Sequence, residues 1–388
     1  MWIGIVLITL HNMDELKQYN FGFFLTRGLS LATWEKIGIL DREIAIYKKL
    51  AEEYNSLYIF SYGGKGEKKY EALFPRNVTV LHRPFMVPVF LYVFIMPFIQ
   101  RNTCRRLDVI KTNQMDGSIA AVLVKKMFHP KLVVRCGYEW LSYLESTNAS
   151  FFKKMIAFNV ETYAYSNADK VIISSEPAKH FIKERFGVED TSITVIPNAI
   201  NTTHFSPHRE NRISRRIVFV GRIESVKNLE SLIRSLQGLD AHLVVIGEGS
   251  LQEELKRVAK DVSVEVEWLG VVSQKELPSE LNKSDIFVLP SFSEGNPKSL
   301  LEAMSCGLPC VGSAVPGIEA VIKNGVNGIT CGTDVDSLRD AISILLKDEE
   351  LKKKIGDNAR KTIEEIYSLD TIFKKEVMLY DQILRYTK

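Results

Sequence analysis

Short runs of Val, Ile and Leu alternate with helical patterns along most of this 388-residue chain. A strand that helices cover on both faces reads as an unbroken apolar run, so this alternation is typical of parallel sheets in α/β proteins. The polar stretch 199–215 has no apolar period and separates two such series. The pattern therefore predicts two α/β units with a boundary near 200–212.

We expect strands at the apolar runs and helices between them. In the first half, strands are predicted at 3–9, 56–62, 77–82, 107–113, 131–136, 170–175 and 192–198, and helices over 32–53, 86–101, 117–128, 151–166 and 178–186. In the second half, strands are predicted at 216–221, 241–247, 263–270, 285–290 and 308–312, and helices over 228–236, 249–260, 273–283, from Pro297, 334–346, 349–366 and 370–386. Ligands of open α/β sheets bind at the carboxyl ends of the strands, which two such sheets would place around a central cleft.

Composition excludes several classes of protein. The chain is 46% hydrophobic and 25% charged, which is ordinary for a globular protein and argues against disorder. A net charge of +3 is too small for a dedicated nucleic-acid binder. The five cysteines are scattered without a CxxC pair, so a reducing, cytoplasmic compartment fits better than a disulfide framework. The opening MWIGIVLITL lacks a basic leader and a cleavage site, and we interpret it as a strand.

The string SFSEGNPKSLLEAMSCGLPC, residues 291–310, carries two glutamates around a helix start. Asn296 is a good N-cap and Pro297 a good first helical residue. The amides that follow would attract phosphate through oriented donors and the helix dipole; they belong to Lys298, Ser299 and Leu300. Glu294 lies outside the helix and Glu302 about 9 Å inside it. A diphosphate here would have a hydroxyl-binding carboxylate on either side, unless both glutamates are simply solvated charges.

This string resembles the signature of the group 1 retaining glycosyltransferases, family four, which reads approximately S-x-x-E-G-x-x-x-x-x-x-E-A-M-A-x-G-x-P-V-V. Ser305 and Cys310 are mild departures from it. Four further segments resemble the family: the G-R-x-x-x-x-K-N segment in 218–233, the G-x-G loop in 244–251, the P-N-G-V hinge in 196–200, and 315–331 with Glu319 and Gly325 in register. The G-x-G loop lacks the third glycine of a dinucleotide fingerprint, which counts against a nicotinamide enzyme.

The resemblance implies a role for each matching residue. Glu294 would contact hydroxyls of the donor sugar, and Arg222 and Lys227 would bind the diphosphate; we name these three as catalytic. Glu302 would bind the ribose, and the base would rest by backbone contact near Val272. The other donor-binding residues would be Gly221, Glu248, Gly295, Asn296, Pro297, Lys298 and Ser299.

The fold implied is GT-B, which consists of two Rossmann-like doubly wound parallel-sheet domains facing a central cleft. The acceptor domain would be 1–205 and the donor domain 206–369, with the helix 370–388 crossing back to the first domain. The mechanism implied is transfer with retention at the anomeric carbon, without a metal ion or other cofactor, in the synthesis of polysaccharides or glycoconjugates. Fixed cations would stabilise the charge that develops on the departing phosphate.

The acceptor half gives weaker signals. Residues at or after the ends of predicted strands, or near the start of a helix, are candidates for acceptor binding: Arg27, Ser30, Asp116, Arg135, Tyr138 and Glu139. For the segment around Ser30, helix entry and packing is an equally simple interpretation. Many relatives carry a histidine after the strand that ends at Cys136, where this chain has Gly137 and Tyr138, so a histidine-assisted step is not expected.

Segment 84–99 is a run of sixteen uncharged residues with three prolines, bounded by Arg83 and by Arg101. It is shorter than the ~20 residues that span a bilayer. The sequence leaves open a buried or inter-domain helix and a peripheral membrane contact through 84–101 at the inner face of the membrane. A membrane contact would suit a lipid-linked acceptor.

Two rivals to the transferase remain open at this point. A nucleotide-sugar epimerase of similar shape would need no acceptor, and a non-catalytic protein would only bind the nucleotide sugar. The partners expected for the transferase are a nucleotide-sugar donor and a glycan or lipid-linked acceptor, and not a nucleic acid.

Overall fold

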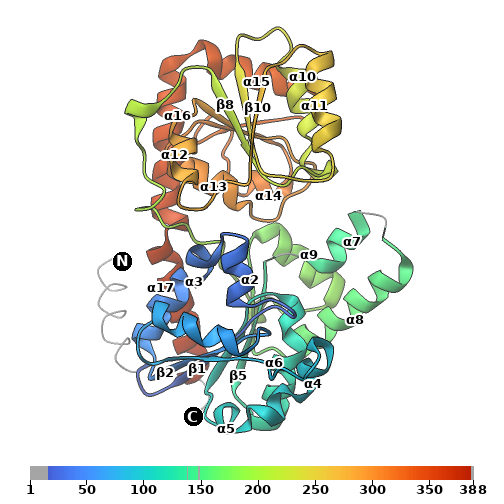
Figure 1. Ribbon diagram of the computed structural model, residues 1–388, viewed down its shortest axis with the longest axis vertical. Helices are drawn as coiled ribbons and strands as arrows, with labels where there is room; N and C mark the ends of the chain where they lie inside the picture. The colour runs from blue at the N-terminus through green and yellow to red at the C-terminus, as the bar shows by residue number, and fades with distance from the viewer. Residues whose placement is uncertain (1–15, 138, 147–148, 386–388) are drawn as a thin grey trace. The chain divides into compact units, whose positions relative to one another are not determined.

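The computed structural model describes residues 16–137, 139–146 and 149–385. Its internal contacts divide the chain into two units, which Figure 1 shows as ribbons. Unit 1 contains the residues up to Pro197 and those from Phe373 onward, and unit 2 is Asn198–Ile372. The boundary that we placed at 205/206 therefore differs from the structural one, because Phe205 is 3% exposed and packs in the core of unit 2.

Unit 1 is built on a seven-stranded parallel sheet in the order β3-β2-β1-β4-β5-β6-β7. Its strands are β1 Asn20–Phe24, β2 Ser56–Phe60, β3 Val78–Leu81, β4 Val109–Thr112, β5 Lys131–Cys136, β6 Lys170–Ile173 and β7 Ile193–Val195. The α-helices of this unit are α2 Leu31–Lys36, α3 Leu40–Glu53, α4 Val89–Ile99, α5 Arg101–Cys104, α6 Ser118–Phe128, α7 Trp140–Ser146, α8 Phe151–Asn167 and α9 Glu176–Phe186. Helix α17, Leu369–Arg385, begins in unit 2 and joins unit 1 at Phe373.

Strand β1 was not predicted from the sequence. It pairs with β2 on one side and β4 on the other, and Phe21, Phe23 and Phe24 are at most 1% exposed. Gly22 at its centre packs closely, because an added Cβ would lie 3.0 Å from the side chain of Ile110. The strand predicted at 3–9 lies outside the described residues.

The single helix predicted over 32–53 is two helices, α2 and α3. Gly38 separates them with φ +73, a left-handed conformation that glycine adopts without strain. The start of α2 is capped by Ser30, whose Oγ accepts a hydrogen bond from the amide of Thr33. The short elements η1 (Lys65–Leu73) and α7 were also not predicted.

Unit 2 is built on a six-stranded parallel sheet in the order β10-β9-β8-β11-β12-β13. Its strands are β8 Arg216–Val220, β9 His242–Ile246, β10 Val266–Gly270, β11 Ile286–Leu289, β12 Cys310–Ser313 and β13 Ile329–Cys331. Its helices are α10 Leu229–Ser235, α11 Gln252–Asp261, α12 Leu277–Asn282, α13 Lys298–Ser305, α14 Pro316–Glu319, α15 Val335–Lys347 and α16 Glu349–Thr362. Strand β13 and helix α14 were not predicted; the other strands and helices lie within a few residues of the predicted ranges.

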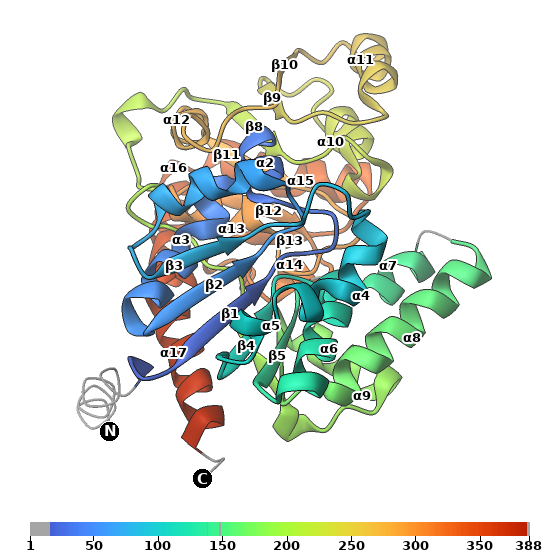
Figure 2. The same cartoon turned by 60° about the horizontal axis from the view of Figure 1, so that its bottom comes forward.

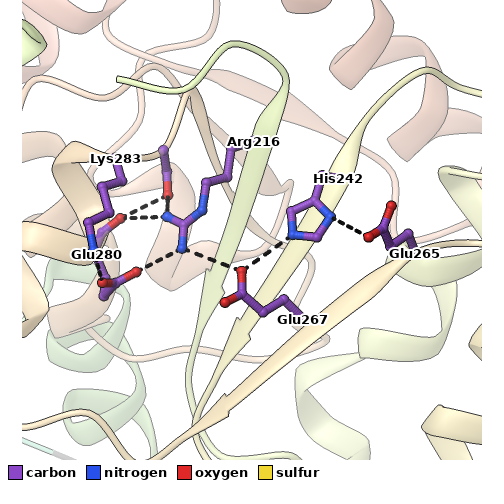
Figure 3. A network of polar contacts seen from close by, with 7 residues as sticks. Arg216, His242, Glu265, Glu267, Glu280 and Lys283 are labelled. Carbon is purple, nitrogen blue, oxygen red and sulfur yellow. Dashed lines mark hydrogen bonds and ion pairs between the residues drawn. The ribbon is translucent and has the colours of Figure 1, made fainter. Parts of the chain in front are cut away.

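A charged network closes the amino ends of β8, β9 and β10 (Figure 3). Arg216, the first residue of β8, is 5% exposed and donates to Glu280 Oε2 at 2.7 Å. Glu267 lies between Arg216, at 3.9 Å, and His242, at 3.4 Å. These side chains pair with one another at the amino ends of the strands, opposite to the carboxyl ends that carry the loops of the candidate site.

Candidate functional site

Two loops of unit 2 meet through an ion pair at the carboxyl ends of neighbouring strands. Lys227 follows β8 and Glu294 follows β11, and Lys227 Nζ lies 2.6 Å from Glu294 Oε1. The same carboxylate oxygen accepts a hydrogen bond from Ser291 Oγ at 2.7 Å. The side chains are 17% and 10% exposed, so a solute can still reach them. The structure thus brings together two of the three residues that we named as catalytic.

The loop that carries Lys227 is held in place by its neighbour Asn228. This residue has a left-handed backbone (φ 53) and is 6% exposed. Its Nδ2 donates to the carbonyls of Pro290, at 3.1 Å, and Thr333, at 2.8 Å. The sequence analysis assigned no role to Asn228 or to Ser291. The signal for Asn228 is its place in the K-N string, and for Ser291 its place at a strand end three residues before Glu294.

The G-x-G loop after β9 packs directly on the backbone of the loop after β8. An added Cβ on Gly247 would lie 2.0 Å from the carbonyl oxygen of Gly221, and one on Gly249 would lie 2.2 Å from that of Ile223. The amide of Ile223 in turn donates to the carbonyl of Glu248 at 2.9 Å. Both glycines are therefore required for this close backbone approach, whatever the loop binds.

The loop that carries Glu294 is fixed in a similar way. An added Cβ on Gly317 of α14 would lie 2.0 Å from the carbonyl oxygen of Glu294 and 2.6 Å from that of Gly295. Ser313 Oγ donates to the carbonyl of Ser291. The resemblance in 315–331 thus has a physical reason, because this segment supports the loop of the signature string.

The start of α13 differs from the prediction by one residue. Asn296 was predicted as the N-cap, and this was wrong: its Oδ1 accepts from the amide of Asn198 at 2.8 Å, and its carbonyl accepts from Asn198 Nδ2 at 2.8 Å. Pro297 is the N-cap rather than the first helical residue. The first bond of the helix runs from the amide of Leu301 to the carbonyl of Pro297, so the amides of Lys298 and Ser299 precede the helical ladder.

The remaining donor-site candidates occupy different environments. Arg222 is exposed in the loop after β8, and Lys298 and Ser299 are partly exposed at the start of α13. Glu302 is 2% exposed. Val272 is partly buried against the core of unit 2.

The string Asp334-Val335-Asp336 has the Asp-x-Asp form that metal-dependent transferases of the other major fold use to hold a diphosphate through a cation. In this structure Asp334 is the N-cap of α15 and accepts from the amide and the hydroxyl of Ser337. These hydrogen bonds hold the pKa of Asp334 below its usual value. The string therefore has a capping role at the start of a helix.

In unit 1, the structure brings two of the six acceptor candidates together. Arg27 Nε lies 3.2 Å from Asp116 Oδ1, and both side chains are partly exposed. Burial raises the pKa of Asp116, although Arg27 opposes the shift. Ser30 is 7% exposed and is engaged as the cap of α2.

The other three acceptor candidates do not form a group. Arg135 Nη1 points to Glu376 Oε1, at 3.6 Å, in a buried ion cluster with Lys111. Glu139 has a buried Oε1 for which the described residues provide no hydrogen-bond partner, and burial raises its pKa. Tyr138 lies outside the described residues.

Comparisons with known protein families match both halves of the chain. The family described as Glycosyl transferases group 1 matches residues 201–362, which contain both loops of the ion pair. The family described as Glycosyltransferase Family 4 matches residues 44–204. The chain belongs to the group 1 glycosyltransferases. The predicted GT-B fold is confirmed as two Rossmann-like parallel-sheet domains.

Two curated relatives illustrate the range of chemistry. N-acetyl-alpha-D-glucosaminyl L-malate synthase of Bacillus anthracis is 27% identical over 253 residues, which are 56% of this chain and 66% of the relative. UDP-Gal:alpha-D-GlcNAc-diphosphoundecaprenol alpha-1,3-galactosyltransferase of Escherichia coli is 26% identical over 66% of this chain and 71% of the relative. The chain thus spans about two thirds of the length of the curated relatives that it matches.

A solved structure extends the likeness in fold to almost the whole chain. The crystal structure of Anabaena Alr3699/HepE in complex with UDP has a TM-score of 0.76 and is 16% identical, covering 94% of this chain and 100% of that one. At this identity the likeness establishes the fold alone.

Proposed function

We propose that this protein transfers a sugar from a nucleoside-diphosphate donor to an acceptor hydroxyl, with retention of the anomeric configuration and without a metal ion. The observation that carries the proposal is the Lys227–Glu294 pair, held at 2.6 Å beside the start of α13. A cation and a helix start within one small region suit the diphosphate, which departs as the leaving group, and a carboxylate suits the hydroxyls of the donor sugar.

Each group has a defined task in this proposal. The diphosphate rests against the start of α13 and is met by Arg222 and Lys227. Glu294 accepts hydrogen bonds from sugar hydroxyls and fixes the ring. As the bond between the anomeric carbon and the phosphate oxygen breaks, negative charge develops on that oxygen, and the two cations stabilise it. Glu302 would bind the ribose, and the backbone near Val272 the base.

Retention follows if the acceptor attacks from the face that the phosphate leaves. The acceptor oxygen then bonds to the anomeric carbon, and its proton passes to the departing phosphate. No protein base is obligatory in this step, so the residues act by positioning and by electrostatics. Arg222 and Lys227 supply the positive charge that a metal ion supplies in other transferases.

We further propose a glycan or lipid-linked acceptor, and a place at the inner face of the membrane. The Escherichia coli relative supports this choice, since its name specifies a diphosphoundecaprenol-linked acceptor. Segment 84–101 is the part of the chain that we propose as the peripheral contact. Within the described part of the chain, none of the helices has the length and apolar character needed to cross a bilayer.

The experiment has two steps. A thermal-shift screen of uridine, guanosine and adenosine diphosphate sugars identifies the donor, because a ligand at 100 times its Kd stabilises the protein by about 2.7 kcal/mol. Transfer of labelled sugar is then measured with and without a chelator, and the anomeric configuration of the product is determined by NMR. Inversion, or loss of transfer with the chelator, contradicts the mechanism. Release of free sugar or epimer favours an epimerase, and binding without turnover favours a binding protein.

Lys227→Ala and Glu294→Ala should abolish most transfer while the protein stays folded. A matched control is Lys256→Ala, because Lys256 also pairs with a glutamate, Glu253, at 2.7 Å, but on the exposed face of helix α11 of the same unit. Full activity in the first two variants, or equal loss in the control, would contradict the assignment.

A further inference from the structure

Helix α4 carries an aromatic stripe on its outer face. Phe90, Phe94 and Phe98 are spaced four residues apart and are 67%, 53% and 61% exposed. On the opposite face, Tyr92 and Met96 are fully buried. The alternative of a buried helix for this segment was therefore wrong, because one side of α4 packs on the unit and the other carries large apolar side chains that face outward.

A second apolar face lies at the beginning of α8. Phe151 and Phe152 are 75% and 71% exposed, and Met155 and Ile156 extend the same face by one turn. The first turns of a helix on a water-facing surface normally carry polar side chains. This face was not noticed in the sequence, because α8 as a whole is of mixed composition.

The two helices that carry these faces lie on the same side of the sheet of unit 1. Helix α6 packs against both α4 and α8. Figures 1 and 2 show all three helices on one side of the seven-stranded sheet, whereas α17 runs beside α3 on the other side. Two helices on one side of the sheet can contact one extended surface at the same time.

Basic residues lie beside both apolar faces in the sequence, and the two segments that carry these faces contain no acidic residue. Segment 84–107 contains Arg101, Arg105 and Arg106 and no Asp or Glu, and segment 149–160 contains Lys153 and Lys154 and no Asp or Glu. Basic residues beside exposed aromatic residues are complementary to an anionic lipid surface, where the aromatic rings enter the headgroup region and the cations meet phosphate.

We infer that unit 1 docks on an anionic bilayer through two elements, α4 and the first two turns of α8. The contact at 84–101 is already part of the proposed function, and the inference rests on that proposal for this contact. The face on α8 is new and provides a second point of attachment. Two points fix the orientation of unit 1 on the membrane, whereas a single helix would leave it free to rotate. A lipid-linked acceptor would then meet the unit in a defined orientation.

The test is co-sedimentation of the full chain with phosphatidylcholine vesicles, with and without phosphatidylglycerol. Binding is expected only with phosphatidylglycerol, and it should weaken as salt is raised. Phe94→Ser/Phe98→Ser and Phe151→Ser/Phe152→Ser should each lower vesicle affinity by about tenfold or more, because each pair removes two rings from the interface. Lys153→Gln/Lys154→Gln should lower it by about fivefold per residue.

The control is Met378→Ser, since Met378 is 53% exposed, like Phe94, but lies on α17. It should leave vesicle affinity unchanged. Equal binding to neutral vesicles, or full binding by the Phe151→Ser/Phe152→Ser variant, overturns the inference. So does a lipid-free dimer, measured by light scattering, that the same phenylalanine substitutions dissociate, because the two faces would then bind a second copy of the chain.

The outcome is separable from that of the proposed function. Stabilisation by a nucleoside-diphosphate sugar is measured without lipid, and the phenylalanine variants should keep it together with the melting temperature of the parent. A protein that binds vesicles as predicted but no nucleotide sugar would contradict the proposed function and leave this inference standing.

Discussion

The molecule contains two lysine–glutamate pairs of almost equal length in very different surroundings. In unit 1, Lys111 of β4 lies 2.7 Å from Glu376 of α17, and each side chain is 1% exposed. In unit 2, Lys227 lies 2.6 Å from Glu294, and both side chains are partly exposed. The first pair joins residues 265 positions apart; the second joins two loops at strand ends.

The partners of each pair show what it does. Glu376 also accepts from Tyr380 at 2.7 Å and lies near Arg135, so its charge is fully compensated inside the unit. Burial opposes ionisation, but Lys111 and Arg135 hold the pKa of Glu376 below its usual value. This pair attaches α17 to the sheet. The Lys227–Glu294 pair remains within reach of solvent, so its charges are available to a ligand.

The largest effect is expected from Lys111→Met. It leaves Glu376 buried without its main counter-charge, which typically costs about 3–5 kcal/mol. Denaturant unfolding should show the loss in the transition of unit 1. In Lys111→Met/Glu376→Leu both charges are gone, and most of the stability should return. A double variant as unstable as the single one would contradict the role of charge pairing.

The next largest effect is expected from Glu294→Gln, and it concerns catalytic activity rather than stability. The amide keeps the shape but loses the charge that orients Lys227 and the sugar hydroxyls, and a drop in kcat/KM of about 10²–10³ is expected. Unfolding free energy should change little, in contrast to Lys111→Met. If Glu294→Gln were unstable but fully active when folded, the Lys227–Glu294 pair would have a structural role like that of the Lys111–Glu376 pair.

Glu161 adds a buried carboxylate that has no lysine partner among its described contacts. It accepts from the amides of Trp140 and Leu141 at the start of α7, and burial raises its pKa to about 7. The folded state therefore binds more protons than the unfolded state between about pH 4.5 and 7, and stability should fall over that window as pH rises, by up to about 3 kcal/mol. Glu161→Gln should reduce this dependence of unfolding free energy on pH, which urea unfolding at several pH values measures. An unchanged dependence would mean that other groups cause it.

The smallest effect is expected from Ser291→Ala. It removes one hydrogen bond to Glu294 and leaves Lys227 in place. A net loss of about 1 kcal/mol in transition-state stabilisation, or roughly fivefold in kcat/KM, is expected. A loss as large as that of Glu294→Gln would mean that the serine, and not the lysine, sets the position of the carboxylate.

The sequence predicts the regular parts of both units well, because parallel strands covered on two faces must be continuously apolar. Strand β5 has the bounds that were predicted, 131–136. Strand β1 was missed because its apolar run, 21–25, is short and has Gly22 inside it. Helix α4 was placed correctly, but periodicity did not reveal its outward face, since it is apolar on both sides.

The sequence identified the residues of the site, but it did not show which of them contact one another. Glu294 and Lys227 were both named, yet nothing in the sequence joins residues 67 positions apart. Asn296 was given the wrong local role because a long-range partner, Asn198, takes its side chain. Lys111 and Glu376 carry no motif at all, so only the folded chain reveals their pairing.

The most direct test of the central claim is a crystal structure of the protein with a nucleoside diphosphate. The pyrophosphate should lie against the amides of Lys298 and Ser299, with Arg222 and Lys227 within hydrogen-bond distance of its oxygens. A nucleotide bound elsewhere, with the Lys227–Glu294 pair unchanged and its loop empty, would contradict the account.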